Sequence, residues 1–123
     1  MKRLLLILTV ISFSIPGLSQ ELNLPAQFLK EEQPETYKAV KTFAETKWEE
    51  DHNMILHEIN GQAEAYIELI RLAEAEGPGI KDVIFNALKK WTEGEVGEFD
   101  NPTTDYKMVV HEVKKQMKAK TAY

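Results

Sequence analysis

The chain has 123 residues, among them 15 lysines and arginines, 20 aspartates and glutamates, and no cysteine, which gives a formal net charge of −5. Without cysteine there can be no disulfide and no lipid anchor on an N-terminal cysteine, so the fold must depend on its core. The excess of acidic residues argues against nucleic acids and anionic membrane surfaces as partners.

Residues 1–19 have the pattern of a cleavable signal peptide. Lys2 and Arg3 give a positive start, the apolar run 4–15 follows, and small residues stand at Gly17 and Ser19. As a helix this run would span about 18 Å, whereas the hydrocarbon layer of a membrane is about 30 Å thick. The alternative is an apolar first helix of the mature fold. We expect a signal peptide and no stable membrane anchor after its cleavage.

This pattern predicts the location of the protein. The chain has no usable N-glycosylation site, because the nearest match, at Asn101, is followed by proline. A short signal without a disulfide or such a site is typical of bacterial exported proteins. We therefore expect an exported protein in the periplasm or the external medium.

The chain after the signal predicts helices. Residues 20–33 are expected to be an extended lead-in with one helical turn at most, after Pro25. From 34 to 76 there is no proline, and apolar or aromatic residues recur every eleven positions, close to three helical turns. This unbroken phase favours one long or kinked helix over 34–76. The alternative is two helices, with a new start capped near Asp51.

The second half of the chain has clearer boundaries. Gly77-Pro78-Gly79 ends one helix, a second is expected over 80–92, and Asn101-Pro102 should cap a third over 103–118. No window alternates with period two, so we expect no sheet. The prediction is an all-α fold: an antiparallel bundle of three to four helices forming a single domain over 34–123, preceded by a signal-peptide helix at 1–19.

Charge is unevenly distributed along this domain. Residues 51–76 hold six acidic side chains against one arginine, and residues 107–123 hold five lysines against one glutamate. The preferred interpretation is that these two helices lie side by side and attract each other. The alternative is that the basic segment is a docking surface.

One pair of residues is a candidate metal site. Glu49 and His52 are three positions apart, which would place a carboxylate and an imidazole on one face of a continuous helix. Di-iron bundles use this spacing twice, together with two further glutamates, whereas it occurs once here. The alternative is that His52 is an ordinary residue at the edge of the core. A divalent metal at Glu49 and His52 is thus the second functional hypothesis.

Other chemical signals are weak. No cysteine nucleophile, serine elbow or phosphate-binding glycine loop is present, so the sequence predicts a protein without enzymatic activity and without a cofactor. Aromatic residues are numerous, however. Most should fill the core, while Phe85, Trp91 and Phe99, with the acidic loop 93–100, are candidates for a binding surface.

These observations favour an exported, non-enzymatic helical protein that binds a protein partner in the cell envelope. A homodimer is also expected to be feasible, because one long helix with two short neighbours leaves apolar surface uncovered.

Overall fold

The computed structural model describes residues 21–75, 77, 79–94 and 100–121, and this part of the chain is helical, with no strand. The all-α prediction is confirmed. The predicted signal peptide at 1–19 and Phe99 lie outside the described residues. None of the described helices is long and apolar enough to cross a membrane. The helices are α2 (Leu24–Glu32), α3 (Pro34–Trp48), α4 (His52–Ala75), α5 (Ile80–Lys90) and α6 (Tyr106–Thr121).

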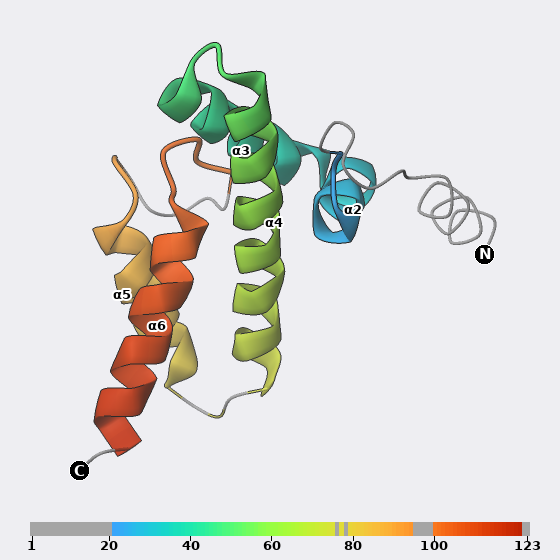
Figure 1. The fold of residues 1–123 in the computed structure, drawn as a ribbon. Helices are drawn as coiled ribbons and strands as arrows, with labels where there is room; N and C mark the ends of the chain where they lie inside the picture. The colour runs from blue at the N-terminus through green and yellow to red at the C-terminus, as the bar shows by residue number, and fades with distance from the viewer. Residues whose placement is uncertain (1–20, 76, 78, 95–99, 122–123) are drawn as a thin grey trace, which may run out of the picture.

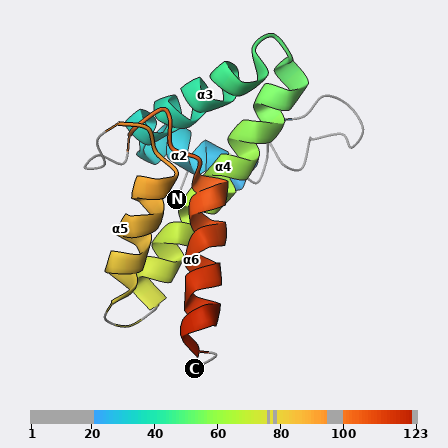
Figure 2. The same ribbon diagram turned by 90° about the vertical axis from the view of Figure 1, so that its left-hand side faces the viewer.

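These five helices form two groups that share α4. In one group α4, α5 and α6 pack side by side, with α5 running opposite to the other two (Figure 1). In the other group α2 and α3 pack on each other and on α4, near the end where α4 begins (Figure 2). The expected count of three to four helices is therefore too low for the described residues, because the region before residue 76 contains three helices.

The predicted extended lead-in over 20–33 is wrong, because a nine-residue helix occupies Leu24–Glu32. Asn23 caps its start: its Oδ1 accepts a hydrogen bond from the backbone N–H of Ala26 at 3.0 Å. Asn23 also anchors the helix on α4, since its backbone N–H donates to Oδ1 of Asn60 at 2.9 Å. Ala26 and Leu29 are then fully buried. An Asn-x-Pro start and two buried side chains are enough to form α2.

The preferred prediction of a single helix over 34–76 is also wrong. Helix α3 ends at Trp48. The backbone of Glu49 then has φ 52° and ψ −103°, a conformation that residues other than glycine rarely adopt. Asp51 then caps the start of α4: its Oδ1 accepts from the N–H of Met54 at 3.1 Å, and its carbonyl accepts from the N–H of Ile55 at 2.9 Å. The alternative prediction, two helices with a capped start near Asp51, is confirmed.

The last two helices lie close to their predicted positions. Helix α5 matches the prediction, but α6 begins at Tyr106 and not at residue 103. Asn101 caps a turn and not the helix, because its Oδ1 accepts from the N–H of Thr103 at 2.8 Å. The cap of α6 is Asp105, whose Oδ1 accepts from the N–H of Met108 at 3.3 Å.

The acidic and basic helices do lie side by side. Nζ of Lys107 is 2.9 Å from Oε2 of Glu58, and Nζ of Lys114 is 3.4 Å from Oε2 of Glu68. Both pairs join α4 to α6. The later residue of α4 pairs with the later residue of α6, so the two helices run in the same direction. The preferred interpretation of the charge pattern is confirmed.

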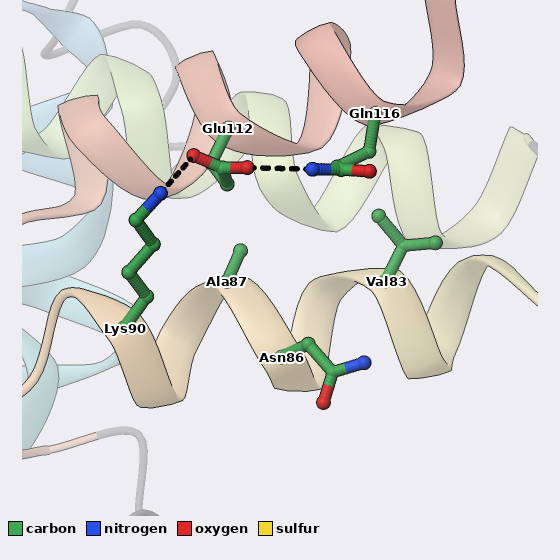
Figure 3. A pocket seen from close by; sticks show the side chains of 6 residues that line it. All are labelled: Val83, Asn86, Ala87, Lys90, Glu112 and Gln116. Carbon is green, nitrogen blue, oxygen red and sulfur yellow. Dashed lines mark hydrogen bonds and ion pairs between the residues drawn. The ribbon is translucent and has the colours of Figure 1, made fainter. Parts of the chain in front are cut away.

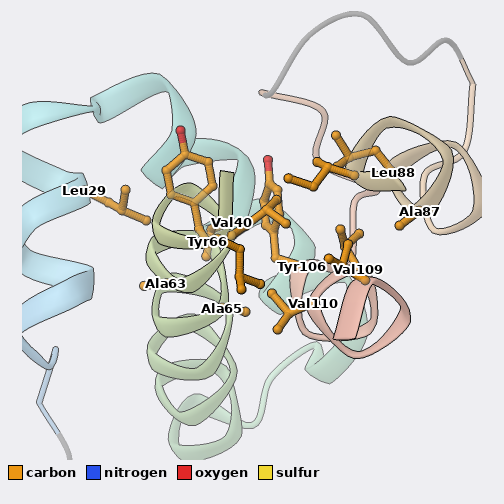
Figure 4. Close-up of a cluster of buried hydrophobic side chains, with 14 of the residues drawn as sticks. Leu29, Val40, Ala63, Ala65, Tyr66, Ala87, Leu88, Tyr106, Val109 and Val110 are labelled. Carbon is orange, nitrogen blue, oxygen red and sulfur yellow. The ribbon is translucent and has the colours of Figure 1, made fainter. Parts of the chain in front are cut away.

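The core lies where α4 faces its neighbours (Figure 4). The rings of Tyr66 and Tyr106 meet there edge to face, with centroids 5.2 Å apart and an interplanar angle of 80°. Further along α6, the β-branched side chains of Val109 and Val113 are fully buried. Small residues of α4 are buried in the same core, with Ala63 on the side of Leu29 and Ala65 on the side of Val110 (Figure 4). Dense packing of this kind fixes α6 against α4 and gives α5 a surface to pack on.

Replacing Glu49 with glycine should stabilise the protein. Glycine adopts the positive φ without steric cost, and relief of this strain exceeds the extra entropy of an unfolded glycine, so we expect a gain of about 1 kcal/mol in the free energy of unfolding. Urea titration measures it. The control is Lys41→Gly, at an exposed position inside α3, which should lose about 1 kcal/mol. A loss for both variants would contradict the strained turn.

Candidate functional site

Two of the three predicted binding residues, Phe85 and Trp91, are described, and the structure does not bring these two together. Phe85 lies on α5 and its side chain is 48% exposed. Trp91 follows the end of the same helix and packs partly buried against the core. Six positions separate them, which places their side chains on different sides of the helix. Phe99 lies outside the described residues. The structure therefore gives Phe85 a different environment from Trp91.

Phe85 forms one wall of an apolar groove between α4 and α5. The groove has a volume of about 270 Å³, and nearly all of its surface is hydrocarbon. Its lining comes from the second half of α4 and from most of α5. The lining residues are Leu69, Ile70, Ala73, Lys81, Ile84, Phe85 and Leu88.

The spacing of residues along α5 explains this groove. Ile84 and Leu88 are four positions apart and both turn into the core, where each is less than 9% exposed. Phe85 follows Ile84 and is therefore rotated by about 100° toward the surface. It stands at the edge of the core and not inside it. The floor of the groove is thus core surface, and Phe85 is its exposed rim.

The rim beside Phe85 carries positive charge. Lys81, Phe85 and Lys89 are each four positions apart, so they form one ridge along α5. Nζ of Lys89 lies 5.7 Å from the centroid of the Phe85 ring, within the range of a cation–π contact. Lys81 lines the groove itself. An apolar floor with a basic edge suits an apolar segment that carries acidic residues beside it.

A second cleft, between α5 and α6, is polar and has a volume of about 360 Å³ (Figure 3). Nζ of Lys90 is 3.0 Å from Oε1 of Glu112, and Nε2 of Gln116 donates to Oε2 of Glu112 at 2.8 Å. The hydrogen bond from Gln116 has the largest effect on the pKa of Glu112, followed by the contact with Lys90, and both lower it. Both oxygens of this carboxylate are thus engaged, and its role is to hold α6 against α5.

Glu58 is the most chemically distinctive side chain of the described residues. It is 1% exposed, and each of its oxygens meets two donors. Oε1 accepts from Nε1 of Trp48 at 3.0 Å and lies 3.1 Å from Nζ of Lys47, both on α3. Oε2 accepts from Nε2 of Gln62 at 2.8 Å and lies 2.9 Å from Nζ of Lys107 on α6. Glu58 therefore connects three helices.

Gln62 extends this connection. It is fully buried, and its Nε2 donates to Oδ1 of Asp105 at 2.9 Å as well as to Glu58. Its Oε1 accepts from the backbone N–H of Tyr106 at 2.6 Å. The amide thereby holds the first turn of α6 by both its donor and its acceptor groups. Glu58, Gln62 and their partners Lys47, Trp48, Asp105 and Lys107 are called the polar network below.

The electrostatics of Glu58 indicate a structural role. Burial alone would raise the pKa of Glu58, but hydrogen bonds from its four donors outweigh that effect and lower the pKa to about 2. A carboxylate that stays ionised and has both oxygens engaged is poorly suited to give or take a proton at neutral pH. In the sequence Glu58 is only one acid of a charged helix, because no local pattern marks it as buried.

The proposed metal pair loses its geometric basis. Glu49 and His52 stand on opposite sides of the break between α3 and α4, so they do not share a helical face, and both are exposed. Within the described ranges, no three histidine, aspartate or glutamate side chains are grouped so that they could hold a metal ion.

Comparison with known proteins gives no further guidance, since no family model, no curated protein and no solved structure matches this chain.

The ionised state of Glu58 predicts an acid-sensitive fold. Its pKa is lowered from 4.5 to about 2 on folding, so its contribution is complete above about pH 4.5 and is lost as the pH falls toward 2. We expect this contribution to be about 3 kcal/mol, and Glu58→Gln to remove it at neutral pH.

Urea titration of both proteins at neutral pH and at about pH 3 tests this expectation. The difference in free energy of unfolding between wild type and Glu58→Gln should shrink in acid, because every other titrating group is common to both. An equal difference at both pH values would show that the carboxylate of Glu58 is not selectively ionised in the folded state.

Proposed function

We propose that this chain is an exported, non-enzymatic helical protein that acts by binding a protein partner in the cell envelope, through the groove between α4 and α5. The observation that carries the proposal is Phe85, a large aromatic side chain that is 48% exposed beside an apolar groove. Exposed apolar surface next to a concavity is a common feature of protein-binding sites.

Energetics support the groove as a contact surface. Covering the exposed half of a phenylalanine removes about 100 Å² of apolar surface from water, which contributes about 2 kcal/mol to binding. The groove floor beneath it adds further apolar area. Aromatic anchors that fill or flank a pocket typically dominate the affinity of such interfaces.

The charges of the described residues favour binding over catalysis. The two buried acids, Glu58 and Glu112, already hold helices together by hydrogen bonds and ion pairs. The groove itself is lined by hydrocarbon apart from Lys81. Such a surface recognises shape and apolar area and offers little to activate a substrate.

Export is supported by the sequence alone. The charged, apolar and small-residue order of residues 1–19 is that of a secretory signal, and we propose that the helix expected there serves targeting only. The remaining chain would then act as a free helical bundle in the periplasm or outside the cell. Its partner is accordingly expected among envelope or secreted proteins.

Site-specific photo-crosslinking in producing cells tests this function. Benzoylphenylalanine in place of Phe85 should give one defined adduct with another protein, because this side chain would lie inside the contact. The matched control is the same residue at Asn86, which is exposed on the same helix but does not line this groove.

Competition then identifies the site of binding. Excess purified wild-type protein should suppress the adduct, whereas Phe85→Asp should not, although its free energy of unfolding should stay within about 0.5 kcal/mol because the position is exposed. No adduct at position 85, or the same adducts at both positions, would contradict the proposed function.

A further inference from the structure

Besides Phe85, two large apolar side chains are exposed among the described residues, and both lie on α2. Leu24 is 49% exposed and Phe28 is 45% exposed. They are four positions apart, so they form one outward ridge, opposite to the face that buries Ala26 and Leu29. About half of each of these two side chains is thus left uncovered by the described part of the chain.

An acidic residue continues the same ridge. Glu31 is exposed and lies three positions after Phe28 and seven after Leu24, which places it on the outward face of α2. The ridge therefore consists of two apolar side chains followed by a carboxylate. We name Leu24, Phe28 and Glu31 the α2 ridge.

The groove between α4 and α5 has the complementary character. It offers an apolar floor, the ring of Phe85, and the ammonium groups of Lys81 and Lys89 on either side of that ring. At 1.5 Å per residue, Leu24 and Glu31 are about 10 Å apart along α2, and the two lysines are about 12 Å apart along α5. The two spans are of similar length, and the charge of Glu31 is opposite in sign to that of the two lysines.

The α2 ridge cannot reach the groove of its own chain. Helix α2 packs on α3 and α4 and has no contact with α5, whereas the groove is formed by α5 and the second half of α4. A ridge and a groove that match but are held apart can meet only between two molecules.

We propose that the groove between α4 and α5 accepts the α2 ridge of a second copy of this chain, with Leu24 and Phe28 on the apolar floor and Glu31 paired with Lys81 or Lys89. This proposal rests on the proposed function of the same groove. One such contact covers Leu24 and Phe28 of one copy and Phe85 of the other. Because ridge and groove are different surfaces, the contact is heterologous, and each copy carries one donor and one acceptor. Self-association would also cover the groove and compete with another partner.

A mixing experiment tests the proposal with two variants of the protein in the form that the producing cell accumulates. Phe28→Asp removes the donor ridge and keeps the groove, and Phe85→Asp removes the groove wall and keeps the ridge. Sedimentation should show that the wild type self-associates and that each variant does so at least about tenfold more weakly. The mixture of both variants should form a one-to-one dimer, because one intact ridge then meets one intact groove.

Charge reversal adds a second arm to this experiment. Glu31→Lys should weaken self-association, and combining it with a chain that carries Lys81→Glu and Lys89→Glu should restore the contact. Asn86→Asp is the matched control and should self-associate like the wild type, because Asn86 is exposed on α5 but lines the cleft between α5 and α6 and not the groove. Urea titration confirms that each variant is folded.

The outcomes separate this proposal from the function on which it rests. A monomeric wild type at about 100 µM, or mixed variants that stay monomeric, would overturn the contact between copies. If position 85 still crosslinks to a different protein in that case, the proposed function stands without self-association. If position 85 crosslinks only to a second copy and the mixed variants form a dimer, the contact between copies stands and the separate envelope partner does not.

Discussion

The buried carboxylate of Glu58 is the interaction on which the rest of this structure depends. An ionised group that is 1% exposed is costly to remove from water unless every oxygen is matched by donors. Trp48 and Lys47 supply two donors from α3, Gln62 supplies one from α4, and Lys107 supplies one from α6. Three helices must therefore meet at one point for this charge to be tolerated. A misaligned packing would leave it unpaired, so the network favours one arrangement over its competitors.

This constraint also determines the geometry of the groove. Gln62 makes hydrogen bonds to Glu58, to Asp105 and to the backbone of Tyr106, and these bonds fix where α6 begins. Helix α6 then presents β-branched side chains, and the pair of Lys90 with Glu112 holds α5 beside it. With α5 held by α6 on one side and packed on α4 on the other, the space between α4 and α5 has a defined shape. A rigid groove loses less entropy on binding than a mobile surface does.

The helical class and the pairing of the acidic helix with the basic one could be predicted from periodicity and charge, because both are local properties. The break between α3 and α4 could be predicted only as an alternative, with a capped start near Asp51, because both helices bury side chains against the same core and an eleven-residue repeat stays in phase across the turn. Phe85 could be predicted as a candidate for a binding surface. Its groove depends on Leu69 and Ile70 of another helix. The burial of Glu58 depends on donors from α3 and on Lys107 of α6, so neither feature follows from local sequence.

Hydrogen exchange of the side-chain amide of Gln62 tests the polar network most directly. Its Nε2 donates to Glu58 and to Asp105 inside a fully buried site. The account predicts that these protons, resolved by NMR, exchange only through global unfolding, with the same protection as the slowest backbone amides of α4. The side-chain amide of Gln27, which is partly exposed, provides the comparison. If the Gln62 protons exchanged as fast as those of Gln27, the polar network would open in the native state and could not be what holds the three helices together.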